Sequence, residues 1–270
     1  MLLSVSCRNE QKAPQQEQID TFSSQPVRKG GDSRTDKRAD SGDGVINLLK
    51  QRVGRGTSEI VLQRTGYVTS YNKQRRTPNW VAWTLTKDHT YGKEQRSGEF
   101  FDEDCDVPEP RATLKDYYNS RYDRGHMCPA GDNKWDGKAM RETFLLTNIC
   151  PQNHGLNKDD WNDLEMQCRM WARRFGRVTI VCGPLYDGEP RYIGRGKVQV
   201  PSGFFKVVYR EKPSPAAIAF VFANSGRPQP WREQVCSVDD VEELTGIDFF
   251  HQLPDDVEEK VEAEAVSDDW

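Results

Sequence analysis

A helical stripe of large apolar side chains near the middle of the chain constrains its fold most. Residues three and four positions apart share one face of an α-helix. The stripe consists of Trp161, Leu164, Cys168, Trp171 and Phe175. Acidic residues precede it and arginines end it, as the helix dipole favours. We therefore predict one long helix, from about Lys158 to Phe175, that packs on a buried partner.

Short β-strands are expected on both sides of this helix. Runs rich in β-branched and aromatic residues alternate with Gly, Asn and Pro, which is typical of antiparallel strands joined by turns. The expected strands span residues 60–62, 67–71, 80–85, 144–148, 178–182, 205–210 and 217–222, with short helices at 139–144 and 238–245. Because strands and helices do not alternate in βαβ order, the pattern predicts an α+β fold, a mainly antiparallel sheet packed by helices.

Composition divides the chain into three parts. Residues 1–57 contain few aromatic residues, which predicts an N-terminal export or lipoprotein-like segment and a disordered linker. Residues 58–253 carry the strand and helix patterns and form the expected folded domain. Residues 254–270 are mostly acidic and are expected to be a disordered tail. The net charge of −4 argues against a nucleic-acid coat protein, but an enzyme can still bind a phosphate backbone locally.

The N-terminus predicts an exported bacterial protein. Small residues precede Cys7, as at the end of a lipoprotein signal, although Ser4 stands where leucine is usual. The expectation is a periplasmic protein, an outer-membrane lipoprotein with a lipid anchor at Cys7, or a secreted protein. A fortuitous apolar start, or a start codon placed too late, would explain the same residues.

The remaining cysteines fit an oxidising compartment. They are Cys105, Cys128, Cys150, Cys168, Cys182 and Cys236. Six cysteines could form up to three disulfides, and free buried thiols are the alternative. Their spacing fits no zinc motif.

His126 stands among residues that suit phosphate chemistry. Histidine has the side-chain pKa nearest neutrality, so it can accept a proton from water. Arg124 offers a fork of donors that matches phosphate oxygens. Gly125 lacks a Cβ and would let a bulky anion approach the backbone. Taken alone, the segment is equally consistent with a histidine satisfied in a turn.

Three polar residues further along the chain extend this chemistry. Asn157 precedes the predicted helix, where its side chain could cap the helix or bind a cation through its amide oxygen. Mg²⁺ prefers oxygen ligands and keeps several waters, so one amide oxygen plus a substrate phosphate would suffice. Glu165 and Arg169 lie four residues apart, and as a surface ion pair they would stabilise the helix by only about 0.3 kcal/mol.

Together these motifs resemble the DNA/RNA non-specific endonuclease family, the ββα-metal or His-Me finger nucleases of the endonuclease G type. The matching segments are Asp123–His126, Thr147–Gln152, Leu156-Asn157, Trp161 and Leu164-Glu165. The resemblance extends more loosely to residues 80–85, Arg96 and residues 181–186. It covers most of residues 58–253 and implies a ββα-metal (His-Me finger) active-site motif within the α+β fold.

The resemblance implies a role for each matching residue. His126 would be the general base that activates water, and Asn157 would be the only direct protein ligand of the catalytic Mg²⁺, with Mn²⁺ as a substitute. Glu165 would orient water bound to the metal, and Asn148 would help to hold the site. The arginines expected to contact phosphate or stabilise the transition state are Arg96, Arg124 and Arg169, with Arg75 and Arg76 as rivals to Arg96.

The implied function is a metal-dependent, sugar-non-specific endonuclease that hydrolyses phosphodiester bonds of DNA and RNA. The metal would stabilise the transition state and the leaving oxygen. DNA and RNA are the expected partners; no segment identifies a protein partner, and a homodimer remains open because some family members are dimers. Within enzymes, the alternative is a phosphodiesterase with a narrower substrate. The alternative that is not an enzyme is a secreted nucleic-acid-binding module with an inactive nuclease fold. The intact set His126, Asn157 and Glu165 argues against this alternative.

Two cysteines lie inside the two main motifs. Cys128 follows His126 by two residues, and Cys150 follows Asn148 by two. We therefore hypothesise that disulfides brace the active-site loops of an exported enzyme.

Overall fold

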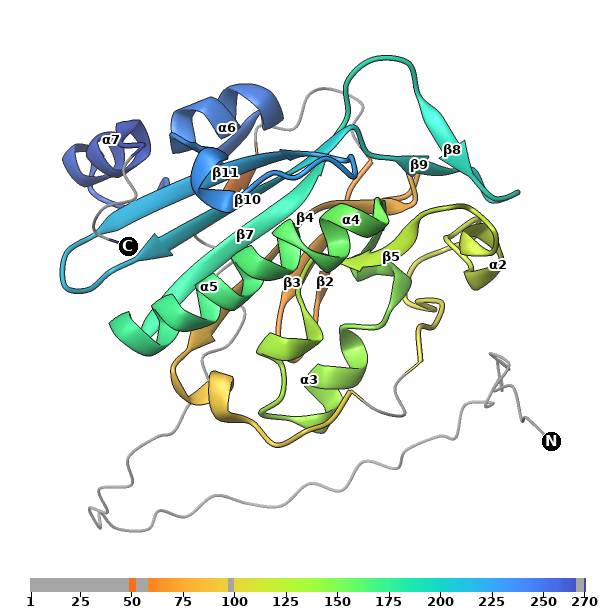
Figure 1. The fold of residues 1–270 in the computed structure, drawn as a ribbon, viewed down its shortest axis with the longest axis horizontal. Helices are drawn as coiled ribbons and strands as arrows, with labels where there is room; N and C mark the ends of the chain where they lie inside the picture. Colours follow the sequence, from red (N-terminus) through yellow and green to blue (C-terminus); the bar gives the residue numbers. More distant parts are fainter. Residues whose placement is uncertain (1–48, 52–57, 97–99, 266–269) are drawn as a thin grey trace, which may run out of the picture. The chain divides into compact units, whose positions relative to one another are not determined.

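A seven-stranded antiparallel sheet forms the centre of the molecule (Figure 1). The computed structural model describes residues 49–51, 58–96, 100–265 and 270, all within one compact unit. The strand order is β12-β11-β10-β7-β4-β3-β2. The strands are β2 (Ile60–Gln63), β3 (Val68–Asn72), β4 (Thr77–Thr86), β7 (Arg177–Leu185), β10 (Gly203–Arg210), β11 (Ala216–Ala223) and β12 (Val235–Cys236). The predicted α+β class and six of the seven predicted strands are confirmed.

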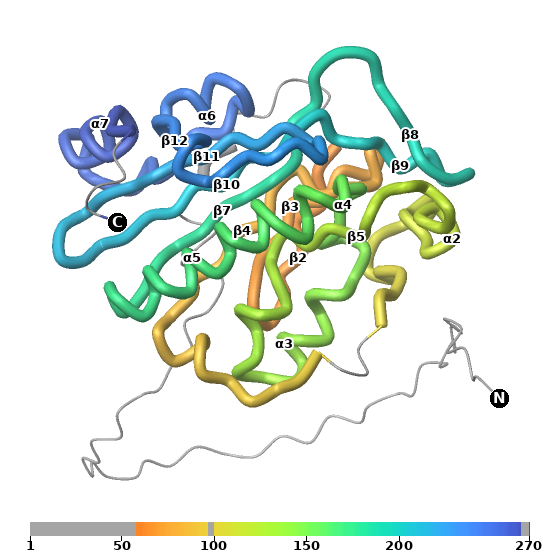
Figure 2. Tube along the Cα trace, in the orientation of Figure 1, coloured from red at the N-terminus to blue at the C-terminus, as the bar shows by residue number. Residues whose placement is uncertain are grey.

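Side chains alternate between the two faces of this sheet and form two hydrophobic cores. On β10, Phe204 and Val208 pack with Trp161 of helix α5 (Asp160–Phe175). Phe205 and Val207 point the other way, into the core that helices α6 (Val238–Thr245) and α7 (Asp255–Ala263) cover. Figure 2 shows α5 running along one face, with α6 and α7 on the side of β11 and β12.

The long helix predicted from Lys158 is interrupted near its start. Helix α4 (His154–Lys158) ends at Asp159, whose φ of −105° and ψ of −91° are not helical, and α5 begins at the next residue. The apolar stripe lies on α5, and its residues Trp161, Leu164, Cys168 and Trp171 are buried as predicted.

The strand predicted at residues 144–148 is wrong. This segment contains a 3₁₀ turn, η3 (Leu146–Asn148), and the strand β6 (Ile149–Gln152) begins after it. The physical reason is a local hydrogen bond from the amide of Asn148 to the carbonyl of Leu145, at 2.9 Å, which closes the turn. Strand β6 pairs with β5 (Asp123–His126) outside the central sheet.

Both flanks that were predicted to be disordered contribute described structure. At the N-terminal side, β1 (Leu49–Gln51) pairs with β13 (Ile247–Phe249). At the C-terminal side, residues 255–263 form α7, because Val257 and Val261 lie four residues apart and pack into the second core. The acidic residues between them occupy the outer face of an amphipathic helix.

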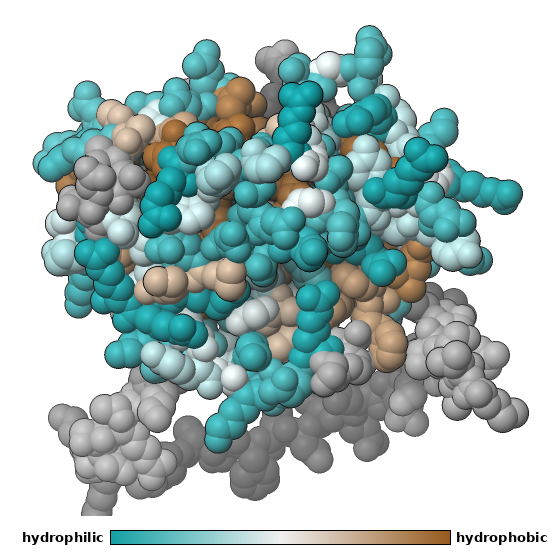
Figure 3. All heavy atoms as spheres, viewed as in Figure 1, coloured by the Kyte–Doolittle hydropathy of each residue, from teal (hydrophilic) through white to brown (hydrophobic). Residues whose placement is uncertain are grey.

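The other elements are short. They are α2 (Leu114–Tyr117), α3 (Gly137–Glu142), β8 (Arg191–Ile193), β9 (Val198–Val200) and the 3₁₀ turns η1 (Asp88–Tyr91), η2 (Ala130–Asp132) and η4 (Trp231–Glu233). Within the described residues, no helix combines the length and apolar character needed to cross a membrane. Figure 3 shows that hydrophilic side chains cover most of the face that carries α5.

Candidate active site

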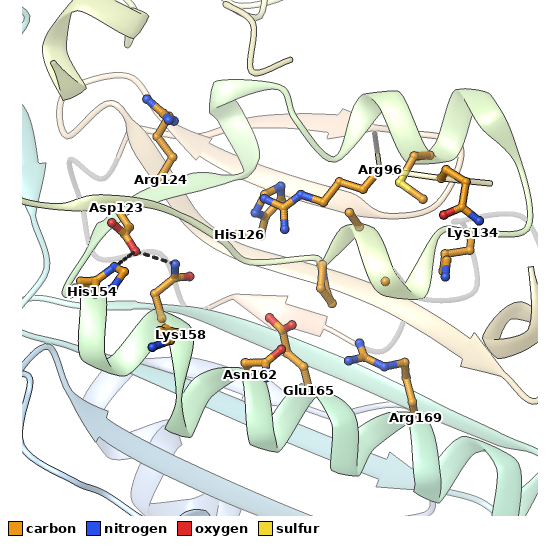
Figure 4. A pocket seen from close by; sticks show the side chains of 16 residues that line it. Arg96, Asp123, Arg124, His126, Lys134, His154, Lys158, Asn162, Glu165 and Arg169 are labelled. Carbon is orange, nitrogen blue, oxygen red and sulfur yellow. Dashed lines mark hydrogen bonds and ion pairs between the residues drawn. The ribbon is translucent and has the colours of Figure 1, made fainter. Parts of the chain in front are cut away.

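A pocket of about 540 Å³ opens where β5 and η2 face helices α4 and α5 (Figure 4). It brings together six of the seven predicted site residues, namely Arg96, Arg124, His126, Asn157, Glu165 and Arg169. The rest of its lining consists of Gln95, Asp123, Pro129, Ala130, Gly131, Lys134, Met140, His154, Lys158 and Asn162. Residues up to 74 positions apart in sequence therefore meet at one cavity.

His126 ends strand β5 and is held between aromatic rings. Its ring meets the edge of Phe144 at a centroid distance of 5.0 Å and lies 5.2 Å from Phe101. Its side chain is only 8% exposed, and its Nε2 has no hydrogen-bond partner among the described residues. Burial, followed by the positive charges of Arg96 and Arg124, lowers the pKa of His126 to about 3. The imidazole is therefore neutral at pH 7.

Asn157 is fixed by a carboxylate on the neighbouring strand. Its Nδ2 donates to Oδ2 of Asp123 at 2.9 Å, and the Nδ1 of His154 lies 2.9 Å from the same oxygen. Asn153, not Asn157, caps helix α4, because the Oδ1 of Asn153 accepts from the amide of Gly155. The capping interpretation of Asn157 is therefore wrong. Its own amide oxygen accepts no hydrogen bond from the described residues, and its side chain lines the pocket.

Asn148 lies behind the pocket and uses its whole amide to hold the backbone. Its Oδ1 accepts from the amide of Cys128 at 2.9 Å, and its Nδ2 donates to the carbonyls of Cys128 and Thr143. The side chain is fully buried. Asn148 thus fixes the chain that leaves His126, and it does not line the pocket.

Arg169 is oriented by a residue that the sequence did not single out. Its Nη1 donates to Oδ1 of Asp132 at 2.8 Å, and Oδ2 of the same carboxylate accepts from the indole nitrogen of Trp83 at 3.0 Å. The expected surface pair between Glu165 and Arg169 is replaced by this ion pair, in which Asp132 is only 2% exposed. The one available signal was the position of Asp132, six residues after His126.

Glu165 faces the pocket from α5, one turn before Arg169 (Figure 4). Burial raises the pKa of Glu165 to about 7, against the opposing effect of the nearby cations Lys206 and Arg169. The carboxyl group therefore titrates near neutral pH. In that range it can accept a hydrogen bond in one state and donate one in the other.

Two arginines lie against the two aromatic rings that enclose His126. The guanidinium of Arg124 lies 4.7 Å from the centroid of Phe101, and that of Arg96 lies 5.5 Å from the centroid of Phe144. Both side chains are exposed, so their donors can reach an anion. Arg75 and Arg76, the alternatives to Arg96, do not line the pocket. Arg75 stacks on Tyr186, and the Nε of Arg76 donates to the carbonyl of Pro110.

Gly125 does not open the backbone to an anion, contrary to the prediction. A Cβ at this position would lie 2.1 Å from Oε1 and 2.6 Å from the Cβ of Gln152. Gly125 is buried against that side chain on the paired strand. The glycine is required by packing between β5 and β6.

The expected disulfide bracing of the active-site loops is also wrong. Cys128 and Cys150 are free thiols, as are Cys168, Cys182 and Cys236, whereas Cys105 is disulfide-bonded. The first four lie within the core beneath α5, where burial raises the pKa of each thiol. The alternative of free buried thiols applies to these four.

Residues 46–256 match the model of the DNA/RNA non-specific endonuclease family. The chain belongs to this family. Nuclease EXOG, mitochondrial, of Xenopus laevis is 41% identical over 211 residues, which cover 72% of this chain and 59% of that protein. Nuclease C1 of Cunninghamella echinulata is 36% identical, with 73% of this chain and 85% of that protein covered. A crystal structure of the EndoG/EndoGI complex aligns with a TM-score of 0.68 and 31% identity over 72% of this chain and 86% of that one.

The relatives overturn the prediction of an exported bacterial lipoprotein. Those from Xenopus laevis, Homo sapiens and Saccharomyces cerevisiae are named as mitochondrial nucleases of eukaryotes. The predicted lipid anchor at Cys7 lies outside the described residues. The residues around Cys7 lie outside residues 46–256, which the family model matches, so membership of the family lends the export prediction no support. The chain spans about 59% of the Xenopus protein's length.

Proposed function

We propose that this chain is a divalent-metal-dependent endonuclease that hydrolyses phosphodiester bonds of both DNA and RNA. The observation that carries the proposal is His126, a neutral imidazole with an unpartnered Nε2, in a pocket lined by three arginines. A phosphodiester is an anion that repels nucleophiles, so its hydrolysis needs a base for water and positive charge around the phosphoryl group.

The residues of the pocket fit a hard divalent cation. Asp123 binds the amide nitrogen of Asn157, so the amide oxygen of Asn157 is the end left to accept a cation. Oxygen ligands with additional waters suit Mg²⁺, and Mn²⁺ accepts the same donors. We propose Asn157 as the protein ligand. When bound, such a cation supplies Lewis-acid stabilisation of the negative charge that develops on the phosphate oxygens.

The other pocket residues act on the phosphate and on water. Arg96 and Arg124 would bind the phosphate on either side of His126, and Arg169, oriented by Asp132, would bind it from α5. The imidazole of His126 would take the proton of the attacking water at a ring nitrogen. A bound phosphate would offset the charges of Arg96 and Arg124, which raises the basicity of His126 when substrate is present.

This arrangement predicts little sequence preference. The arginine and lysine side chains of the pocket match phosphates, and phosphates are identical along the polymer. Binding should therefore depend steeply on salt, because each phosphate contact releases counterions.

Cleavage of plasmid DNA and total RNA by the full chain tests the proposal. We expect cleavage of both polymers with Mg²⁺, none with chelator, and a loss of about 10²- to 10⁴-fold in His126→Ala. His251→Ala, which lies outside the pocket, is the matched control and should keep its activity. DNA binding without cleavage under any divalent metal would instead favour an inactive binding module.

A further inference from the structure

A lysine is buried beneath helix α5, which carries Glu165 and Arg169. Lys206 lies on β10 between Phe204 and Val208, so by strand alternation its side chain points towards α5. It is fully buried, and its Nζ has no hydrogen-bond partner among the described residues. A buried ammonium group without a hydrogen-bond partner in the protein is strongly unfavourable, so such a lysine needs a compensating charge nearby.

The position of the ammonium group indicates which charge it compensates. The Nζ lies 4.0 Å from the centroid of the Trp161 ring. Trp161 precedes Glu165 by one helical turn on α5, and helical side chains lean towards the preceding turn. The ammonium of Lys206 therefore lies on the core side of the turn that carries Glu165.

The charges around the pocket's inner wall form a balanced set. Two carboxylates, Asp132 and Glu165, face two cations, Arg169 and Lys206. Arg169 is paired with Asp132 at 2.8 Å. Lys206 stabilises the negative charge of both carboxylates, and Arg169 also acts on Glu165. Among the charges that oppose the rise in the pKa of Glu165, that of Lys206 has the largest effect.

We infer that Lys206 is a buried positioning residue that favours the ionised form of Glu165, so that the group facing the substrate becomes a carboxylate at a lower pH than it would without the lysine. The charged and titratable groups that act on Glu165 or share its surroundings are Lys206 from β10, Arg169 and Cys168 from α5, Asp132 from η2, Cys128 after β5, Cys182 from β7 and Arg96. The consequence for catalysis rests on the proposed function, whereas the coupling between Lys206 and Glu165 does not.

A double-mutant cycle in thermal unfolding of the full chain tests the coupling without using activity. The variants are Lys206→Met, Glu165→Gln and the double variant, with exposed Lys212→Met as the control. At pH 8.5, where Glu165 is ionised, Lys206→Met leaves a half-buried carboxylate without the charge of the lysine beneath it. Adding Glu165→Gln should then raise the midpoint by about 4 °C. At pH 5, where Glu165 is protonated, the same addition should change little.

Two outcomes overturn the inference. One is a coupling that is equal at pH 5 and pH 8.5, because packing does not titrate. The other is a Lys206→Met protein that stays unfolded at both pH values even with Glu165→Gln, which would assign Lys206 to packing alone. If Lys206→Met folds at pH 8.5 only when Glu165→Gln is added, the inference holds.

The pH dependence of cleavage tests the catalytic consequence. In Lys206→Met, the acidic limb of the kcat/KM profile should move up by about one pH unit from the pKa of about 7, so kcat/KM at pH 7 falls by about fivefold and largely recovers by pH 8.5. Lys212→Met should follow the wild type. A loss that is constant with pH would overturn this consequence. If the wild type cleaves nothing, the proposed function fails, while the unfolding cycle still decides the role of Lys206.

Discussion

The amide nitrogen of Asn157 donates to Oδ2 of Asp123 at 2.9 Å, and this bond decides which end of the amide is left for a cation. An unrestrained asparagine can present either its oxygen or its nitrogen. Asp123 is an acceptor, so it holds the nitrogen and turns the oxygen away from itself. Asp123 on strand β5 thus orients the side chain of the proposed ligand, which lies on α4, 34 positions later in the chain.

Removal of this acceptor should weaken metal binding without removing the ligand. We expect Asp123→Ala to raise the Mg²⁺ concentration needed for half-maximal cleavage by about 10- to 100-fold, because outer partners orient metal ligands. Mg²⁺ titrations of cleavage and calorimetry on the same protein would measure the effect. His154→Ala removes the other contact of Asp123 from a largely exposed ring and should cost much less. An unchanged Mg²⁺ dependence in Asp123→Ala would show that Asn157 is oriented by other means.

Asn148 should contribute mainly to stability. Its amide makes three hydrogen bonds to buried backbone groups, so Asn148→Ala leaves those groups without partners. The expected loss in free energy of unfolding is about 3 kcal/mol. Urea denaturation would show it as a lower midpoint with an unchanged slope. Asn162→Ala, at a half-buried position that lines the pocket in front of Asn148, should stay within about 0.5 kcal/mol of the wild type.

The elements that repeat a residue pattern over several turns or pairs could be predicted from the sequence. The apolar stripe that includes Trp161 and Trp171 predicted the main helix, and the β-branched runs predicted six strands of the sheet. The segment from residue 144 to 159 was placed wrongly. Its boundaries depend on single hydrogen bonds, such as the one that the amide of Asn148 makes and the cap that Asn153 provides. The periodic pattern of apolar residues in a sequence does not reveal single hydrogen bonds of this kind.

The same distinction applies to the site. Motifs identified His126, Asn157 and Glu165, which the structure brings to one pocket. Asp132 and Lys206 escaped notice because their roles depend on contacts across the fold. Arg169 lies 37 positions after Asp132. In the sequence Lys206 looks like an ordinary polar position in a strand, and only the packing of α5 over β10 buries it.

The low pKa of His126 predicts how stability depends on pH. The folded pKa of about 3 lies below the 6.5 of an unfolded histidine, so the unfolded chain binds more protons below pH 6.5. Stability is therefore lost as the pH falls from 6.5 towards 3. Between pH 6.5 and 5 the wild type should lose about 1.5 kcal/mol more than His126→Gln. The opposite contribution of Glu165, whose pKa is raised, is present in both proteins and cancels in the difference.

Denaturant titrations at a series of pH values would measure this difference. If the two proteins lost stability in parallel, the pKa of His126 would be nearly the same in the folded and unfolded chains, and burial would not be what keeps the imidazole neutral.

Gly125 gives a test of the packing between β5 and β6. Gly125→Ala places a methyl group 2.6 Å from the Cβ of Gln152, which cannot move without shifting the strand. We expect a loss of about 1–3 kcal/mol in the free energy of unfolding. Cleavage should fall as well, because His126 is the next residue on the displaced strand.

Gly137→Ala is the matched control for this substitution. Its added Cβ would meet its nearest neighbour at 3.4 Å, at the first residue of α3, so stability should be kept or slightly raised. A Gly125→Ala protein as stable and active as the wild type would mean that strand β6 can shift at little cost in free energy. In that case the glycine would have to be explained by the approach of the phosphate to the backbone, which was the interpretation that the sequence alone favoured.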